Sequence, residues 1–390
     1  MVTLKKIKIR KIESSIIKGN FGDGKYFGYK KEKLIALTKI YSNTGNIGIG
    51  ESLVGAYSPI LFMKNLNFIS SIIKKKNITQ TLNALENIQK NKFFFNNGIL
   101  KSIIASLEIA IINLISEIKC QSFAKTTKEV FFKNQNLKIN DCVNVYSSAG
   151  SINSNLSDLK RDIIKSEVLN IDKIKIRINT SSDFKSKIDL LRNNIKDFSV
   201  DLITNTYEKN MNRKKLQSFL SYIKSKNPLW IEEVLNVNNL ENFIHLRQKF
   251  KLKFSYGENF NSLNDFVGLI KYYKFDYINP DITHMPISEL SKLIQFLKNN
   301  NLKKKIIFHC WGSVVNIYST LQISRFLDDF VKFVELPITD FSLNNEFIEQ
   351  ARINNSKFYF DNDFNSSKYY LKETNIKNSK ILKKNSFNFD

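Results

Sequence analysis

The sequence has few cysteines, and it lacks the cysteine and apolar patterns that mark secreted and membrane proteins. An odd number of cysteines stands at wide spacing, at Cys120, Cys142 and Cys310. Neither a disulfide framework nor a zinc-binding spacing is present. Charges interrupt the start, MVTLKKIKIRK, where a signal peptide would need an apolar core. Glu108 and Glu117 break the most apolar stretch, so a buried amphipathic helix is expected rather than a membrane span. We therefore expect a cytoplasmic protein without a membrane partner.

Motifs for nucleic-acid binding are also absent, although the chain is strongly basic. It carries 60 Lys and Arg against 36 Asp and Glu, for a formal net charge of +24. The lysines are scattered along the whole chain, and Ile, Asn and Phe are abundant too, as AT-rich codons would produce. No RRM, KH, zinc-finger or helix-turn-helix signature accompanies them. We expect no nucleic-acid partner, and the charge should steer anionic small molecules to the protein.

The chain of 390 residues is long for a single compact core, and its 42% hydrophobic content can fill two. Alternation of apolar and charged residues predicts a strand at 3–12, and further strands are predicted at 33–41 and 47–52. From about 60 to 120 the apolar spacing becomes helical. These patterns indicate an N-terminal α+β domain over residues 1–130.

From about residue 143, short apolar runs alternate with amphipathic helical stretches. Repeated βα units predict a parallel sheet, and eight of them predict a closed TIM-like barrel of the α/β class. We assign this barrel to residues 131–345, and we expect segment 346–390 to return to the first domain, with a helix at 344–352. The eight predicted strands are 143–150, 173–178, 200–205, 228–233, 253–259, 277–281, 304–310 and 330–336.

Polar side chains end six of these runs in succession. They are Asn205, Glu232, Glu258, Asp281, His309 and Glu335. In a barrel of this kind the carboxyl ends of the strands meet at one mouth, where active sites lie. Carboxylates gathered there repel one another unless a cation is present, and oxygen ligands with room for substrate oxygens suit Mg²⁺.

Several motifs occur in an order that resembles the mandelate racemase and muconate lactonizing enzyme group of the enolase superfamily. They are FGDGKYFG (21–28), NTGNIGIGES (43–52), KIKIR (173–177), WIEEVL (230–235), YGEN (256–259), NPD (279–281), HCWGS (309–313) and VEL (334–336). The resemblance implies a (β/α)₇β barrel with an α+β capping domain. Because this family is usually oligomeric, it also implies a homo-oligomer.

The resemblance further implies a role for each candidate site residue. The ligands of Mg²⁺ would be Asn205, Glu232 and Glu258. His309 would be the general base, and Asp281 would be the carboxylate that orients it. Glu335 would hydrogen-bond the substrate, and Lys175 and Arg177 would be cations facing the substrate. Contacts with a small-molecule carboxylate substrate would come from Tyr26, Tyr57 and Trp311.

The implied reaction is Mg²⁺-dependent removal of a proton next to a carboxylate, giving dehydration or cycloisomerisation of an acid sugar or its lactone. A cation and charged side chains would stabilise the negative charge that develops on the substrate. A histidine that titrates near neutral pH suits the proton transfer.

Two departures from the family pattern keep alternatives open. Asn205 stands where the family has a charged Asp ligand, and Asp201 lies at the wrong end of the predicted strand to replace it. Arg177 stands where the family has a basic lysine, and arginine does not deprotonate readily; a register shifted by two would instead place Lys173 and Lys175 there. A racemase or epimerase of the same superfamily, or a catalytically impaired relative, therefore remains an alternative to the dehydratase or cycloisomerase.

Overall fold

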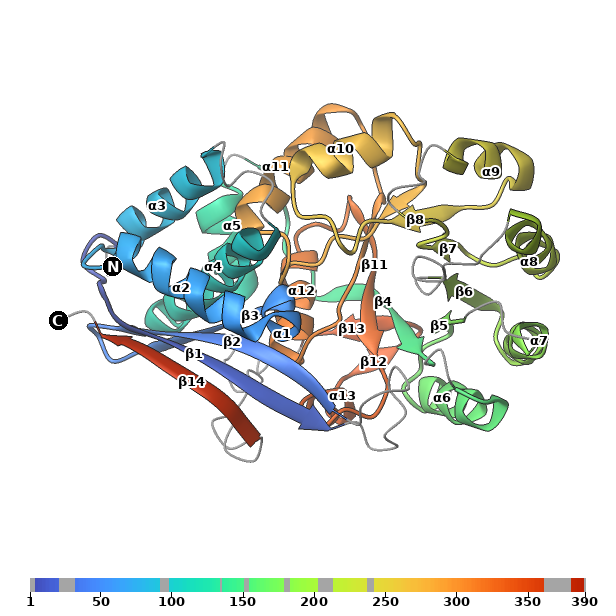
Figure 1. The fold of residues 1–390 in the computed structure, drawn as a ribbon, viewed down its shortest axis with the longest axis horizontal. Helices are drawn as coiled ribbons and strands as arrows, with labels where there is room; N and C mark the ends of the chain where they lie inside the picture. The colour runs from blue at the N-terminus through green and yellow to red at the C-terminus, as the bar shows by residue number, and fades with distance from the viewer. Residues whose placement is uncertain are drawn as a thin grey trace.

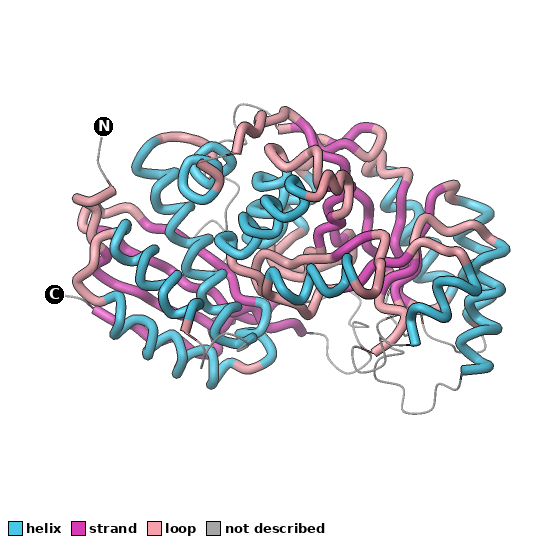
Figure 2. Tube along the Cα trace, turned by 90° about the horizontal axis from the view of Figure 1, so that it is seen from above, coloured by secondary structure: helices cyan, strands magenta, loops and turns pink. Residues whose placement is uncertain are grey.

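The computed structural model describes residues 4–20, 32–91, 98–133, 135–150, 154–178, 183–202, 213–236, 242–360 and 380–388. Two parts lie side by side in it: an antiparallel sheet covered by helices, and a barrel ringed by helices (Figure 1). Seen from above, the N-terminal sheet and its helices lie on one side of the molecule and the barrel lies on the other (Figure 2). This arrangement brings one end of the N-terminal sheet against the barrel.

The N-terminal sheet has the strand order β14-β1-β2-β3, and all of its pairings are antiparallel. Its strands are β1 (Ile9–Asn20), β2 (Glu32–Ser42), β3 (Ile47–Ser52) and β14 (Lys380–Asn388). The first strand was predicted at 3–12, but β1 begins later and continues to Asn20. Residues 12–17 are all buried because β1 pairs on both edges, so charge alternation misplaced this strand.

Five helices belong to this part of the described chain. They are α1 (Leu53–Tyr57), α2 (Pro59–Ile73), α3 (Ile78–Lys90), α4 (Gly98–Lys119) and α5 (Phe123–Phe131). Helices α1, α2 and α4 pack on the N-terminal sheet, and α3 and α5 pack on other helices. Strand β3 approaches α4 so closely that a Cβ on Gly48 would lie 2.0 Å from the Ala110 carbonyl oxygen, and one on Gly50 would lie 1.9 Å from that of Ser106. Only glycine fits there. In the part of the chain that is described, α4 alone is long and apolar enough to cross a bilayer, but it is buried as a core helix.

Eight parallel strands form the barrel, and it closes because β11 pairs with β4. The strands are β4 (Cys142–Ala149), β5 (Lys173–Arg177), β6 (Asp197–Asp201), β7 (Ile231–Glu232), β8 (Phe254–Tyr256), β9 (Tyr277–Ile278), β10 (Ile306–Phe308) and β11 (Val331–Pro337). The helices between them are α6 (Leu156–Val168), α7 (Phe184–Asn194), α8 (Arg213–Ser225), α9 (Phe243–Phe250), α10 (Leu263–Lys271), α11 (Ile287–Asn299) and α12 (Val314–Ser324). The predicted TIM-like (β/α)₇β barrel beside a smaller N-terminal sheet is confirmed.

One barrel strand differs from its prediction in a way that changes the site. The strand was predicted at 200–205, whereas β6 ends at Asp201. Phe198 and Val200 belong to the apolar layer shared with the outer helices, so Ser199 and Asp201 alternate toward the barrel interior. Asp201 is therefore the last residue of its strand and lies at the mouth, where the sequence analysis had excluded it.

An aromatic cluster fills the barrel interior beneath its mouth. Its members are Tyr146, Trp230, Tyr277, Ile307 and Phe333. The rings of Trp230 and Phe333 stack with centroids 5.9 Å apart, and Tyr146 meets Trp230 edge-on. This floor supports the charged side chains above it and keeps water out from below.

The C-terminal segment divides between the two parts. After β11, the short helix α13 (Asn345–Glu349) occupies part of the helix predicted at 344–352. The hairpin of β12 (Ile353–Asn354) and β13 (Lys357–Tyr359) then pairs with β4 on the barrel. Strand β14 returns to pair with β1.

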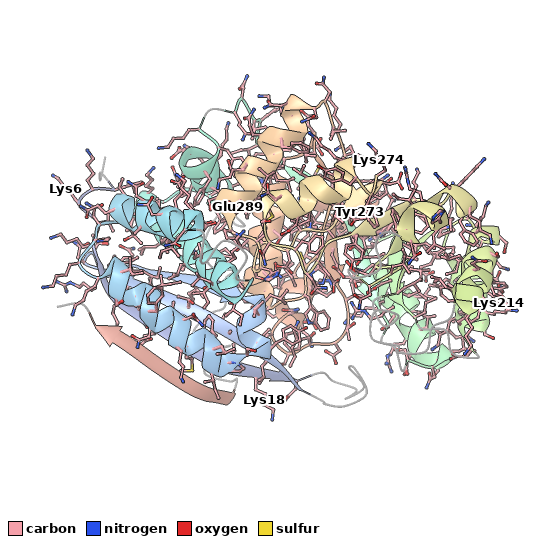
Figure 3. The ribbon with its side chains drawn as sticks, turned by 45° about the horizontal axis from the view of Figure 1, so that its top comes forward. Lys6, Lys18, Lys214, Tyr273, Lys274 and Glu289 are labelled. Atoms are coloured by element: carbon pink, nitrogen blue, oxygen red, sulfur yellow. The ribbon has the colours of Figure 1, made fainter. Side chains whose placement is uncertain are left out.

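Surface lysines come from both parts of the molecule. Lys6 and Lys18 lie on the N-terminal sheet side, whereas Lys214 and Lys274 lie on the outer barrel elements (Figure 3). The positive charge is therefore distributed over the surface, as the sequence suggested.

Candidate active site

Strand β5 places two cations in the barrel. Lys175 is buried, and its Nζ lies 2.6 Å from Oε1 of Glu232 and 3.0 Å from Oε1 of Glu335. Burial alone would lower the pKa of Lys175, but the two carboxylates raise it well above its usual value. Lys173, on the same face of the strand, instead pairs with the exposed Asp172 at 2.7 Å. Lys175 is thus a permanent cation inside the mouth.

The second cation of β5 pairs with the residue that the sequence analysis set aside. Arg177 Nε donates to Oδ2 of Asp201 at 2.7 Å, and the strand register places Asp201 opposite Arg177 on one side and Glu232 on the other. The view that Asp201 lies at the wrong end of its strand was wrong. The alternation of Phe198 and Val200 with Ser199 and Asp201 was the signal that could have found it.

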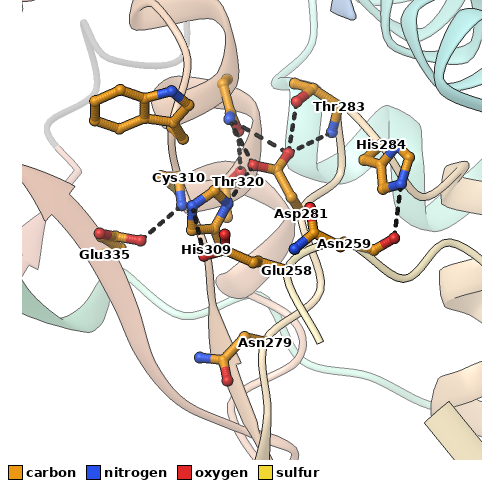
Figure 4. Close-up of polar contacts among 12 residues, drawn as sticks. Glu258, Asn259, Asn279, Asp281, Thr283, His284, His309, Cys310, Thr320 and Glu335 are labelled. Atoms are coloured by element: carbon orange, nitrogen blue, oxygen red, sulfur yellow. Dashed lines mark hydrogen bonds and ion pairs between the residues drawn. The ribbon is translucent and has the colours of Figure 1, made fainter. Parts of the chain in front are cut away.

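A buried histidine and aspartate form a dyad at the ends of β10 and β9 (Figure 4). Nδ1 of His309 is 2.8 Å from Oδ2 of Asp281. The Asp281 carboxylate also accepts hydrogen bonds from the backbone N–H and hydroxyl of Thr283, at 2.8 and 2.6 Å, and from Nδ2 of Asn316 at 3.2 Å. Burial would raise the pKa of Asp281, but the bonds from His309 and Thr283 lower it. The carboxylate is therefore ionised and held rigidly, and Nε2 of His309 is directed away from it.

Glu258 faces the other side of that imidazole. Its Oε2 lies 3.4 Å from Nε2 of His309 but, although it is buried, accepts no hydrogen bond from the described residues. Burial and the nearby charges of Asp201 and Glu232 raise the pKa of Glu258 to about 7, against the opposing effect of His309. Burial would lower the pKa of His309, but Glu258 and Asp281 raise it to about 9. A further cation near Glu258 would therefore stabilise the ionised form of this side chain.

The donor chemistry of the mouth fits a divalent cation such as Mg²⁺. The ionisable side chains described above are five carboxylates and three cations, namely Asp201, Glu232, Glu258, Asp281 and Glu335 against Lys175, Arg177 and protonated His309. When all eight groups are ionised, two negative charges are left over, and buried carboxylate oxygens are the ligands that Mg²⁺ prefers.

The described residues do not, however, contain a preassembled group of three His, Cys, Asp or Glu side chains around one point. Lys175 already holds Glu232, and Arg177 already holds Asp201. A bound cation would therefore compete with these two side chains for its oxygen ligands. The carboxylates at the mouth therefore fit Mg²⁺ in the type of their donor atoms and in their net charge.

Two side chains of the N-terminal sheet also reach the loop after β10. Glu51 of β3 accepts hydrogen bonds from the Ser313 backbone N–H at 3.0 Å, the Ser313 hydroxyl at 2.7 Å and the Asn316 N–H at 3.3 Å, so it caps α12. Lys33 of β2 donates to the carbonyl oxygen of Trp311. Lys33 was not among the predicted site residues, because no local pattern distinguishes a lysine of an apolar strand that reaches the mouth from one that faces solvent.

The remaining predicted residues have varied placements. Trp311 follows β10 and is partly exposed at the mouth, with Arg177 5.5 Å from its ring centroid. Tyr57 ends α1 and is 68% exposed. Tyr26 and Asn205 lie outside the described residues. The structure thus brings Lys175, Arg177, Glu232, Glu258, Asp281, His309, Glu335 and Trp311 to one mouth.

Comparisons with known proteins agree with this fold. Residues 161–358 match the family model described as enolase C-terminal domain-like. The 3,6-anhydro-D-galactonate cycloisomerase of Zobellia galactanivorans superposes with a TM-score of 0.73 at 16% identity, over 91% of this chain and 94% of its own. An L-talarate dehydratase of a Polaromonas species, solved with Mg and L-glucarate, gives a TM-score of 0.71 at 14% identity, over 99% of this chain and 100% of its own. A comparison with curated protein sequences finds no match.

Proposed function

This chain belongs to the enolase superfamily, in its mandelate racemase and muconate lactonizing enzyme group, and from that premise we propose that it is an enzyme that abstracts a proton next to a carboxylate. The observation that carries the proposal is the buried pair of His309 and Asp281 at the same barrel mouth as the two cations of β5. A base oriented by a fixed carboxylate, opposite positive charge, is what removal of a weakly acidic C–H proton requires.

In the proposed reaction, His309 accepts the proton at Nε2, because Nδ1 is held by Asp281. The charge of Glu258 raises the pKa of His309, so neutralising that carboxylate would favour the basic form of the imidazole. The electron pair of the C–H bond moves onto the substrate carboxylate, where Lys175 and Arg177 lie nearby as fixed cations. Glu335, held by Lys175 and by the N–H of Cys310 at 3.0 Å, is placed to hydrogen-bond the substrate.

We propose Mg²⁺ as the cofactor, held by Asp201, Glu232 and Glu258. When bound, it would supply a Lewis acid that stabilises negative charge on the substrate carboxylate. Asp201 takes the place first assigned to Asn205, because Asp201 ends β6 in register with Glu232. The third ligand, Glu258, offers the buried oxygen that accepts no hydrogen bond from the described residues.

For the substrate we propose an acid sugar or its lactone, with dehydration or cycloisomerisation as the outcome. Two similar structures carry such activities in their names, a galactonate-type cycloisomerase and a talarate dehydratase. One histidine can first take the α-proton and then return it to the leaving group or to the new C–H bond. A racemase would need a second base, and Lys175, held between two carboxylates with a raised pKa, does not supply one. The free cysteines agree with the proposed cytoplasmic location.

The test is exchange of the α-proton in deuterated water, measured by NMR over a panel of acid sugars with Mg²⁺. We expect His309→Asn to lower exchange and turnover by about 10²-fold or more, the usual contribution of a general base. His245→Asn, which changes an exposed histidine on α9, is the matched control and should behave as wild type. Turnover that survives His309→Asn would remove the proposed base. Failure of wild type to exchange any acid would instead favour a catalytically impaired relative.

A further inference from the structure

Thr283 holds the carboxylate of the dyad by the oxygen that His309 does not use. Its backbone N–H and its hydroxyl both donate to Oδ1 of Asp281, at 2.8 and 2.6 Å. The first bond is that of an Asx turn, which any residue except proline could form here. The second needs the hydroxyl of Ser or Thr, and a short bond to an ionised carboxylate is among the stronger hydrogen bonds in proteins. Oδ1 is therefore occupied twice, and Oδ2 is left for the imidazole at 2.8 Å.

Asn316, in the first turn of α12, holds the same carboxylate from a second element. Its Nδ2 lies 3.2 Å from Oδ2 and 3.4 Å from Oδ1 of Asp281. Its own Oδ1 accepts a hydrogen bond from the hydroxyl of Thr320 at 3.0 Å, so the amide is fixed with its NH₂ group toward Asp281. Asn316 and Thr283 are both fully buried. The carboxylate therefore cannot rotate without breaking bonds that water does not replace.

Thr283 is itself fixed by its backbone. Its carbonyl oxygen accepts hydrogen bonds from the Ser102 hydroxyl at 2.7 Å and from the Leu53 N–H at 3.1 Å. The donors that Thr283 and Asn316 direct at Asp281 are all neutral, so they stabilise the ionised carboxylate without cancelling its charge. That charge remains available to hold Nδ1–H of His309, and the bond made at one ring nitrogen decides the role of the other.

From these contacts we propose that Thr283 is a positioning residue, whose hydroxyl fixes the plane of the Asp281 carboxylate and thereby holds Nε2 of His309 toward the mouth. Asn316 is the second support of the same carboxylate. Thr283 acts through Asp281 rather than on the substrate. A misplacement of about 1 Å in such a group can cost about 10²-fold in rate. The inference rests on the proposed function for the role of His309 as base, although the contacts it concerns exist without substrate.

The first experiment records the proton NMR spectrum without substrate and follows Nδ1–H of His309, whose bond to a buried carboxylate shifts its resonance far downfield. Loss of the resonance in His309→Asn assigns it. Thr283→Val keeps the volume of the side chain and removes only the hydroxyl, so we expect the resonance to move upfield or to broaden by exchange with water. Thr283→Ser should restore it. The matched control is Thr127→Val, which removes a buried hydroxyl bonded to the Phe123 carbonyl and should leave the resonance unchanged.

Turnover gives the second measurement. Thr283→Val should lower kcat by about tenfold, as for loss of a hydrogen bond to a charged group. KM should change by less than about twofold, because the groups that contact the substrate remain. A wild-type kcat, or a loss through KM alone, would overturn the proposal.

An unchanged His309 resonance in Thr283→Val, or a change that Thr283→Ser does not reverse, would overturn the proposal as well. Thermal melting shows whether Thr283→Val is folded. If it is not, Asn316→Leu replaces it, and its control is Asn113→Leu, which removes a buried amide bonded to the Ile49 N–H at 2.9 Å. Because the spectrum needs no substrate, an altered resonance in a protein that exchanges no α-proton would support the positioning of His309 by Thr283 while the proposed function fails.

Discussion

Replacing Lys175 with methionine removes the one cation that lies between Glu232 and Glu335. All three side chains are at most 1% exposed, and the ammonium lies 2.6 and 3.0 Å from the two carboxylates. Methionine fills a similar volume but leaves two buried negative charges next to each other. Breaking a buried ion pair in this way typically costs about 3–5 kcal/mol.

The ion pair with Lys175 also affects the titration of Glu335. Burial would raise the pKa of Glu335, but Lys175 and His309 lower it to about 2 from an ordinary value of 4.5. A lowered folded-state pKa contributes stability that is present above pH 4.5 and lost as pH falls through 2. Loss of Lys175 should therefore remove part of the stability that ionised Glu335 contributes at neutral pH.

The assay is thermal unfolding with a chelator present, so that no metal compensates the charge. At about 2–4 °C per kcal/mol, Lys175→Met should lower Tm by about 6–12 °C at pH 7, and the difference should shrink at low pH as the carboxylates are protonated. Lys173→Met is the matched control, because Lys173 lies on the same strand face but pairs with the 62%-exposed Asp172. That pair is worth less than about 1 kcal/mol. Equal Tm values for the two variants would refute the reasoning.

Two further predictions concern stability away from the reacting centre. Burial raises the pKa of Glu108 to about 7 although it accepts hydrogen bonds from Ser288, so its contribution to stability is present below pH 4.5 and lost as pH rises through 7. In urea unfolding at pH 8, Glu108→Gln should therefore have a free energy of unfolding about 3 kcal/mol higher than wild type, with little difference at pH 5. A difference in free energy that is the same at both pH values would contradict this. Glu51→Ala leaves the N–H of Ser313 uncapped and should cost about 1–3 kcal/mol in urea unfolding, and a wild-type midpoint would show that the cap contributes nothing.

The sequence predicted the barrel because its units repeat. Most strands carry a short apolar run followed by a polar residue at the carboxyl end. Because this pattern recurs, it identified Glu232, Glu258, Asp281 and His309 as residues at the carboxyl ends of barrel strands. The strand predicted at 47–52 is β3, and its Gly48 and Gly50 admit the backbone of α4. Period and composition are local properties, so these features are visible without coordinates.

Features that depend on partners were not visible. The bounds of β1 were misplaced because they depend on its pairing with β2 on one edge and, on the other, with β14, which is far away in the sequence. Asp201 was set aside because the end of a five-residue strand is fixed by its register with β5 and β7. Lys33 and Glu51 contact the loop after β10, which lies more than 250 positions later in the sequence. No pattern within the segments around these two residues could have predicted that contact.

The pairing of β14 with β1 has a consequence for how the protein is made. Residues 9–20 leave the ribosome more than 350 residues before residues 380–388, so one edge of β1 stays without its neighbour while the intervening chain is made. At about 5–20 residues per second that interval is on the order of tens of seconds. An open strand with six consecutive buried residues is a site for unwanted pairing with other chains during that time. A nascent chain of this protein should therefore depend on chaperones until β14 is synthesised and pairs with β1.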